Sequence, residues 1–179
     1  MIFAAFFCAK ELTNLSILSR INALDSEGRL IGYVPSVIGF QEGPSRQLWL
    51  TRAAHEWCFP MGRHPDGVKE SSLAAARAQL DHFVRGSTLL PGQDMKHLDP
   101  YHLEVWTIRT FLDPKVRLFG WFVQPRTFIV VHGKRRDQLE RSSVGPKWNR
   151  SVQKVVEARL ELFPGIFPYS GFSFGDYVG

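Results

Sequence analysis

The chain has 179 residues, enough for one ordinary domain or for a small domain with an extension. Hydrophobic residues make up 44% and charged residues 22%, a globular mixture that excludes wholesale disorder and collagen-like or low-complexity architectures. The formal net charge at pH 7 is +5.

The basic residues are unevenly distributed along the chain. Residues 109–159 contain twelve lysines and arginines against four acidic residues, whereas residues 1–108 contain ten basic and eleven acidic residues. Residues 160–179 have no basic residue and two acidic ones. Clustered basic charge suits a phosphate-backbone partner, because each neutralised phosphate releases a counterion. A solvated basic face without a ligand is the alternative.

The sequence also bears on the compartment of the protein. No apolar run approaches the ~18 residues that cross a bilayer, so no membrane partner is expected. The apolar opening, residues 1–9, lacks the basic region and cleavage pattern of a signal peptide and is interpreted as core-forming chain. Cys8 and Cys58 are too few for a disulfide scaffold. These features predict a cytoplasmic protein with reduced thiols.

In the first half of the chain, the sequence pattern predicts two helices separated by less regular segments. Leucine and isoleucine recur at helical spacing over residues 9–24. Residues 29–40 favour short strands or loop, and residues 48–59 are compatible with a strand that two alanines interrupt. A second helix with an apolar stripe is expected to begin at a cap formed by Ser71 or Ser72.

The second half predicts a small sheet and a last helix. Residues 103–111, 116–123 and 127–132 have the composition of strands, and the short turns between them specify an antiparallel meander packed on the preceding helix. A helix is expected over residues 148–163. The aromatic tail, residues 164–179, is expected to dock onto the sheet or onto a partner, because so much exposed aromatic surface would be a liability.

Three short segments carry a family resemblance. Residues 106–109 read Trp-Thr-Ile-Arg, residues 116–119 read Val-Arg-Leu-Phe, and residues 128–135 read Phe-Ile-Val-Val-His-Gly-Lys-Arg. This succession resembles the RelE/ParE/HigB superfamily of bacterial toxins, whose members have an arginine at the end of one strand, another at the start of the next, and an apolar third strand that runs into a basic loop. The resemblance covers about residues 71–160.

The resemblance implies both a fold and a function. The fold is α+β, RelE-like: a small, twisted antiparallel sheet with helices on one face and basic residues on the concave other face. The toxin domain would span residues 51–163, between an N-terminal extension, residues 1–50, and the tail, residues 164–179. Many family members are endoribonucleases that cut mRNA in the ribosomal A site, whereas the ParE branch poisons DNA gyrase. RNA or the ribosome, and a cognate antitoxin protein, are therefore the implied partners of a toxin–antitoxin system.

Metal-free RNA cleavage needs a base, an acid and cations that stabilise the scissile phosphate. Arg109 and Arg117 match family positions that contact phosphate, and strand parity places Arg109 on the open face of the sheet. His132 can move a proton near neutral pH. These three residues are the catalytic candidates, and they are expected to converge on one patch with Lys134. The candidates for RNA or phosphate binding are Lys134, Arg135, Arg136 and, as an exposed ring for base stacking, Trp148.

The same residues have ordinary structural interpretations, and the chain departs from the ribonuclease pattern. Val105 and Thr107 stand where some members have lysines, and residues 139–141 lack the family's catalytic tyrosine. A HigB-type active site, which uses histidine with a basic partner, is compatible with these differences, whereas a RelE-type active site is not. Two hypotheses stay open: an mRNA endoribonuclease, and a non-catalytic RelE/ParE-like binding module, such as a gyrase-inhibiting toxin or a silent homologue. No zinc-site spacing or glycine-rich phosphate loop occurs, so neither metal nor cofactor is expected.

Overall fold

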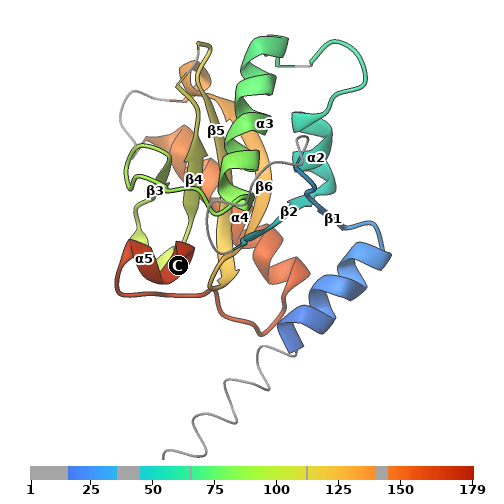
Figure 1. The fold of residues 1–179 in the computed structure, drawn as a ribbon, viewed down its shortest axis with the longest axis vertical. Helices are drawn as coiled ribbons and strands as arrows, with labels where there is room; N and C mark the ends of the chain where they lie inside the picture. Colours follow the sequence, from blue (N-terminus) through green and yellow to red (C-terminus); the bar gives the residue numbers. More distant parts are fainter. Residues whose placement is uncertain (1–15, 36–44, 65, 112, 140–144) are drawn as a thin grey trace, which may run out of the picture.

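The computed structural model describes residues 16–35, 45–64, 66–111, 113–139 and 145–179, which form one sheet covered by helices (Figure 1). The six strands, in the order β1-β2-β6-β5-β4-β3, are β1 (Leu30–Gly32), β2 (Gln47–Thr51), β3 (Met95–His97), β4 (Trp106–Arg109), β5 (Val116–Gln124) and β6 (Thr127–Arg135). β2 and β6 are parallel, and every other neighbouring pair is antiparallel. The sheet is therefore mixed, and the expectation of a purely antiparallel sheet is wrong.

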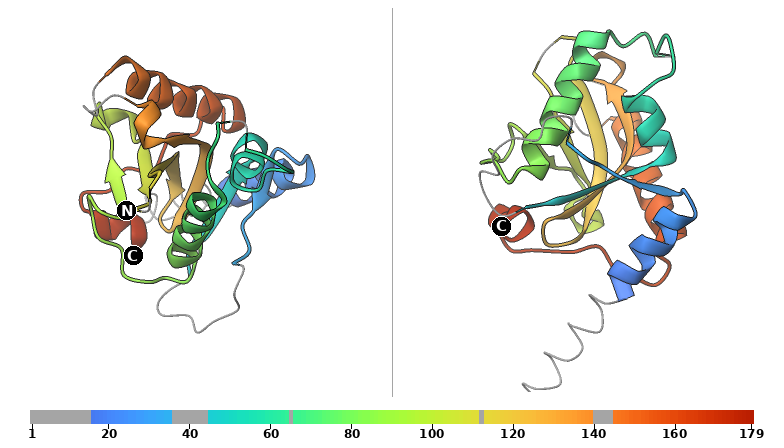
Figure 2. Two further views of the ribbon diagram at one scale, coloured as in Figure 1. Left: turned by 90° about the horizontal axis from the view of Figure 1, so that it is seen from above. Right: turned by 45° about the vertical axis from the view of Figure 1, so that its right-hand side comes forward.

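Helices cover both faces of this sheet (Figure 2). In the described residues they are the helix at residues 16–26, α2 (Arg52–Cys58), α3 (Glu70–Val84), α4 (Pro146–Leu162) and α5 (Phe174–Val178). α2 and α3 lie on one face, whereas α4 and the helix at residues 16–26 lie on the other. The expectation of helices on one face is therefore wrong. Both faces of β5 are apolar, because Leu118 and Phe122 point to the α3 side and Phe119 and Trp121 to the α4 side, and each set needs cover.

The predicted meander and its helices are confirmed, with shifted ends. β4, β5 and β6 pair in antiparallel order, and Trp106 and Ile108 pack with α3 in one core. β4 begins only at Trp106, because a 3-10 turn, η1 (Tyr101–Leu103), precedes it and Glu104 adopts a left-handed φ of 51°. α3 begins at Glu70, with Lys69 as the capping residue. Neither serine caps it, because Ser71 and Ser72 both lie inside the helix.

The segment expected to be an extension contributes an edge of the sheet. β2 crosses the expected boundary at residue 50 and pairs with the first half of β6, Leu48 opposite Phe128 and Leu50 opposite Val130. The apolar segment 48–59 is split into strand and helix at Thr51, whose side chain accepts a hydrogen bond from the Ala54 amide at 3.2 Å. Helical structure over residues 16–26 agrees with the predicted first helix. Residues 9–15, Cys8 and residues 36–44 lie outside the described residues.

The aromatic tail docks onto the sheet, which was one of the two predicted outcomes. Its backbone bonds to β5 through the Tyr169 amide and the Phe122 carbonyl at 2.9 Å. Tyr177 and Val178, in α5, are buried in the core beneath α3. The buried guanidinium of Arg46 donates to the Val178 carbonyl at 2.7 Å, which holds the end of the chain in place.

A bulge between β5 and β6 requires glycine at one position. Phe119 pairs with His132 and Gly120 with Val130, so Val131 is the extra residue on β6. The bulge turns both Val131 and His132 toward the α4 side. At Gly120 the two backbones approach so closely that a Cβ atom would lie 2.0 Å from the Ile129 carbonyl oxygen and 2.8 Å from the Phe128 ring.

We expect Gly120→Ala to destabilise the protein by about 1–3 kcal/mol, because the added methyl group forces two central strands apart. Urea unfolding gives the change in unfolding free energy. Gly175→Ala is the matched control, since its Cβ would meet only the Ser173 hydroxyl, at 3.6 Å, and the helical site favours alanine by up to about 1 kcal/mol. Equal unfolding free energies for Gly120→Ala and the wild-type protein would contradict this account of the bulge.

Candidate functional site

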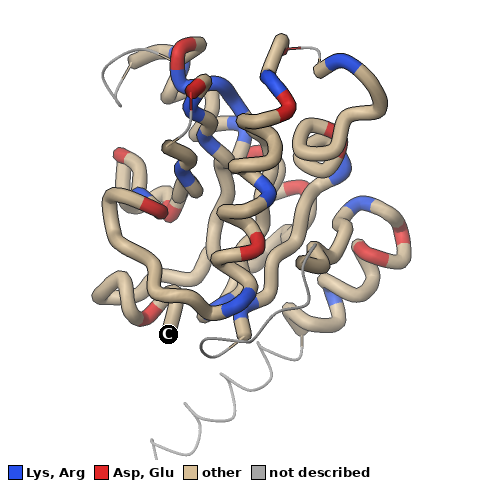
Figure 3. Tube along the Cα trace, turned by 45° about the horizontal axis from the view of Figure 1, so that its top comes forward, with Lys and Arg blue, Asp and Glu red and all other residues tan. Residues whose placement is uncertain are grey.

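Most of the basic side chains of residues 109–159, the basic segment of the sequence, gather at one end of the sheet, where β6 leaves the core (Figure 3). The strand register aligns three of the predicted residues there. Arg109 on β4 lies opposite Arg117 on β5, and Arg117 lies opposite Lys134 on β6. Directly paired residues point to the same face of a sheet. These three cations therefore form a row on the face that α4 covers, so the expectation that Arg109 faces an open side of the sheet is wrong.

The two arginines of this row are bound to backbone carbonyl groups. Arg117 is only 5% exposed, and its Nη1 donates to the Val116 carbonyl at 2.8 Å and the Thr110 carbonyl at 3.3 Å. Burial, followed by repulsion from Arg109 and Arg136, lowers the pKa of Arg117 to about 10, which leaves it charged at neutral pH. Arg109 donates to the Gly92 carbonyl. Both guanidinium groups therefore stabilise the backbone where strands meet connecting loops.

His132 packs beneath α4 with a polar partner. Its ring stacks on Phe119, with 4.7 Å between ring centroids, and its Nε2 lies 3.2 Å from the Ser151 carbonyl oxygen. An acceptor at this distance favours the neutral tautomer that carries its hydrogen on Nε2. Burial above all, with smaller contributions from Lys154 and Lys134, lowers the pKa of His132 to about 4. At neutral pH the ring is uncharged and cannot act as a strong acid.

His132 lines a depression that also contains several basic side chains. This α4-side depression has a volume of about 550 Å³, and it is lined by Ala53, Trp57, Asp66, His132, Gly133, Lys134, Gln138, Lys147, Arg150, Ser151 and Lys154. Residues 147, 150 and 154 are three and four apart, so they form one stripe on α4. Among the described residues, no carboxylate forms an ion pair with Lys134, Arg150 or Lys154. The lining has one acidic side chain, Asp66, which accepts from Trp57 Nε1 at 3.1 Å.

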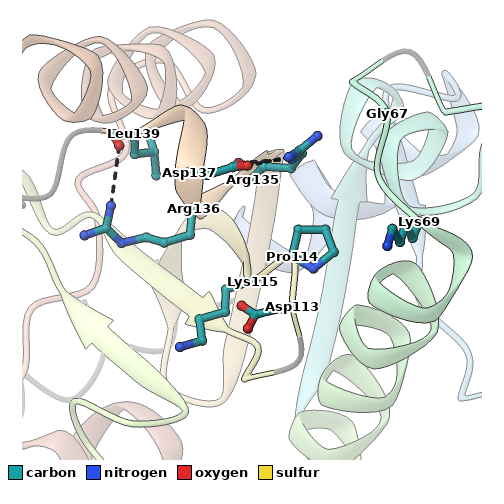
Figure 4. Close-up of a pocket in the computed structure, with 9 residues that line it drawn as sticks. All are labelled: Gly67, Lys69, Asp113, Pro114, Lys115, Arg135, Arg136, Asp137 and Leu139. Atoms are coloured by element: carbon teal, nitrogen blue, oxygen red, sulfur yellow. Dashed lines mark hydrogen bonds and ion pairs between the residues drawn. The ribbon is translucent and has the colours of Figure 1, made fainter.

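A second depression lies on the other side of β6, near the start of α3 (Figure 4). This α3-side depression has a volume of about 680 Å³ and is lined by Gly67, Lys69, Asp113, Pro114, Lys115, Arg135, Arg136, Asp137 and Leu139. Its cations are partly compensated. Arg135 pairs with Asp137, whose pKa it lowers, and also donates to the Asp66 carbonyl at 3.2 Å. The α3-side depression is therefore the less positive of the two.

Trp148 does not present a ring for stacking, so the expectation that it is exposed is wrong. Its side chain is 4% exposed and packs edge-on against Phe119, with 5.6 Å between ring centroids. Arg136 covers the ring at 5.5 Å and donates to the Leu139 carbonyl at 3.5 Å. Trp148 lies one helical turn before Val152 on the buried stripe of α4, and this spacing could have indicated its burial.

The structure therefore brings together part of the predicted site and adds residues that sequence reasoning missed. His132 and Lys134 share the α4-side depression, whereas Arg135 and Arg136 line the α3-side depression. The missed residues are Arg150 and Lys154 on α4 and Lys69 and Lys115 around the α3-side depression. The three-and-four spacing of the cations on α4 is a signal that could have found the first two.

The environment of His132 predicts a pH-dependent stability. Its folded pKa, about 4, lies below the ordinary value of 6.5, so the unfolded chain binds more protons between these values and stability falls as the pH drops through this window. Between pH 7.5 and pH 5, the wild-type protein should lose about 2 kcal/mol more than His132→Gln in urea unfolding. NMR titration of the imidazole measures the pKa directly, and a midpoint near 6.5 would contradict the burial argument.

The described residues contain no group of three or more histidine, cysteine, aspartate or glutamate side chains arranged to hold a metal ion. None of the described helices combines the length and the apolar character needed to span a membrane. Comparison with protein-family models, with curated proteins and with solved structures found no match for this chain. The chemistry of the site is therefore inferred from its own side chains, which offer a concentrated positive charge beside a partly buried, neutral histidine.

Proposed function

We propose that the protein binds the phosphate backbone of RNA at the α4-side depression, as a RelE/ParE/HigB-like binding module without a catalytic step of its own. The observation that carries this proposal is the set of Lys134, Arg150 and Lys154, which come from two elements, line one depression and form no ion pair with any carboxylate of the described residues. Like charges brought together in one hollow repel each other, and an anion in that hollow removes the repulsion.

The shape of the basic end favours a chain of phosphates over a single small anion. Successive residues of β6 serve both depressions, because Lys134 lines the α4-side depression and Arg135 lines the α3-side depression. The exposed charge is carried mainly by lysines, which contact phosphates as mobile point charges and do not impose a base sequence. A polyanion with little sequence preference fits this arrangement.

The environments of the partly buried His132 and the buried Arg117 favour the non-catalytic hypothesis. A general acid needs a pKa near the working pH, whereas that of His132 is lowered to about 4. Arg117 directs its Nη1 to the carbonyl groups of Val116 and Thr110. Binding needs neither group, because the cations of the α4-side depression reach solvent independently of them.

Charge reversal tests the proposal. Lys134→Glu and Lys154→Glu should each weaken binding to a single-stranded oligoribonucleotide and reduce the slope of log affinity against log salt by roughly 0.7, the value for one lost phosphate contact. Fluorescence anisotropy at several salt concentrations measures both quantities. Arg52→Glu is the control, because this exposed arginine of α2 lies outside both depressions. An RNA affinity that is absent in the wild-type protein, or a slope unchanged in both lysine variants, would refute the proposal.

RNA cleavage is the second candidate function, and the position of His132 in the lining of the same depression as Lys134 favours it. If bound RNA is cut there, His132→Gln should lower the cleavage rate by about 10²–10⁴-fold while RNA affinity changes by less than about twofold. A single-turnover assay with labelled RNA and chelator separates rate from affinity, and the fold of the variant is checked by circular dichroism. Equal rates in His132→Gln and the wild-type protein, or no cleavage by either, would leave the binding function alone.

A further inference from the structure

A separate pocket lies at the β3 edge of the sheet, where the C-terminal segment with α5 packs beside β3 and β4 (Figure 1). Its volume is about 320 Å³, close to the lower end of the usual range for ligand pockets. It is lined by His97, Tyr101, His102, Glu104, Trp106, Gly171, Phe172, Ser173, Phe174 and Tyr177. Aromatic rings and one carboxylate therefore make up most of the wall, in contrast to the basic end.

The carboxylate of Glu104 is buried without a cation in contact with it. Its side chain accepts from the Ser170 hydroxyl at 2.7 Å and from the Tyr177 hydroxyl at 2.8 Å, and the residue is 7% exposed. Among the described residues, no lysine or arginine forms an ion pair with it. Arg159 is attracted by the charge of Glu104, which opposes the lowering of its pKa by burial, but its Nη1 donates to the Leu103 carbonyl at 2.7 Å and forms no ion pair with Glu104. Buried carboxylates are normally paired with a cation, so this carboxylate is available to bind a cationic ligand.

The histidine that lies close to this carboxylate has a neutral ring. His97 Nε2 lies 3.4 Å from Glu104 Oε2 and makes no hydrogen bond. Burial lowers the pKa of His97, and this effect outweighs the opposing attraction of Glu104 and Asp99. The ring also stacks on Trp106 with a centroid distance of 4.4 Å, which fixes it in the wall. The charge of Glu104 is thus not neutralised by His97 near neutral pH.

The aromatic wall suits a flat cation. Trp106 and Tyr177 are buried, whereas Phe172 is fully exposed and Tyr101 is 55% exposed. Cations bind to aromatic faces, and the planar, weakly hydrated guanidinium group both stacks on rings and donates to carboxylate oxygens. An ammonium group is more strongly hydrated and matches only the second of these features.

We propose that this pocket binds a guanidinium group through Glu104 and the surrounding rings, supplied by an arginine of a partner protein or by a free arginine derivative. The interaction is independent of RNA binding, because the pocket shares no residue with either basic depression. Glu104 also has a left-handed backbone conformation, with φ of 51°, and such strained residues are common at ligand-binding sites.

Titration with N-acetyl-arginine amide, followed by the assigned indole resonance of Trp106 and by calorimetry, tests the proposal. Saturable binding is expected, and N-acetyl-lysine amide should bind more weakly. Glu104→Gln should weaken arginine binding by at least about tenfold, since a hydrogen bond to a charged group is lost. Glu157→Gln is the matched control, because it makes the same chemical change outside the pocket, on the exposed side of α4, where Gln153 donates to it.

Phe172→Ala keeps the test decisive if Glu104→Gln fails to fold. The Phe172 ring is fully exposed, so its removal leaves the core intact, and it should weaken arginine binding by about two- to fivefold. A short peptide with one arginine distinguishes the two sources: tighter binding than the free derivative indicates a protein partner, and equal binding indicates the free derivative. No saturable shift at Trp106, or one affinity shared by the wild-type protein and both variants, would overturn the proposal.

Discussion

β5 and β6, nine residues each, form an antiparallel pair with apolar side chains on both faces, and the rest of the fold is arranged around it. Phe122 and Phe128 contact each other on the α3 side, with 4.8 Å between their ring centroids, while Trp121 and Ile129 pack on the α4 side. A ribbon that is apolar on both sides cannot leave either side in water. Helices on both faces meet this requirement, and β2 and β4 pair with the two edges of the ribbon.

Arginine has two distinct roles in this protein, and the difference matters for function. Arg46, Arg117 and Arg159 are buried, and each donates to backbone carbonyl oxygens. Such cations are part of the internal hydrogen-bond pattern, although two of them belong to the basic segment of the sequence. The charge that a ligand can reach comes instead mainly from lysines at the end of β6 and along α4. A count of basic residues therefore overstates the binding surface.

Two separate parts of the sheet carry side chains of opposite charge. At one end, cations line two depressions on either side of β6. At the β3 edge, Glu104 and a set of rings line a smaller pocket that the C-terminal segment completes. The tail is held there by the Tyr177 and Ser170 hydroxyl groups, both of which donate to Glu104. Glu104, the acidic side chain in the lining of that pocket, thus also holds the C-terminal segment in place.

Local sequence pattern determined the elements of this protein more fully than their assembly. Alternation and short turns identified the β4–β6 meander, helical spacing identified α3 and α4, and the aromatic excess of the tail indicated that it docks, because these signals act between residues near in sequence. The parallel contact of β2 with β6 and the cover of both faces came only from tertiary structure, since they join segments some eighty residues apart. The site divides in the same way. The sequence indicated that His132 and Lys134 are close, whereas tertiary packing placed α4 over His132, buried Trp148 and added Arg150 and Lys154, because burial and charge depend on what packs across the sheet.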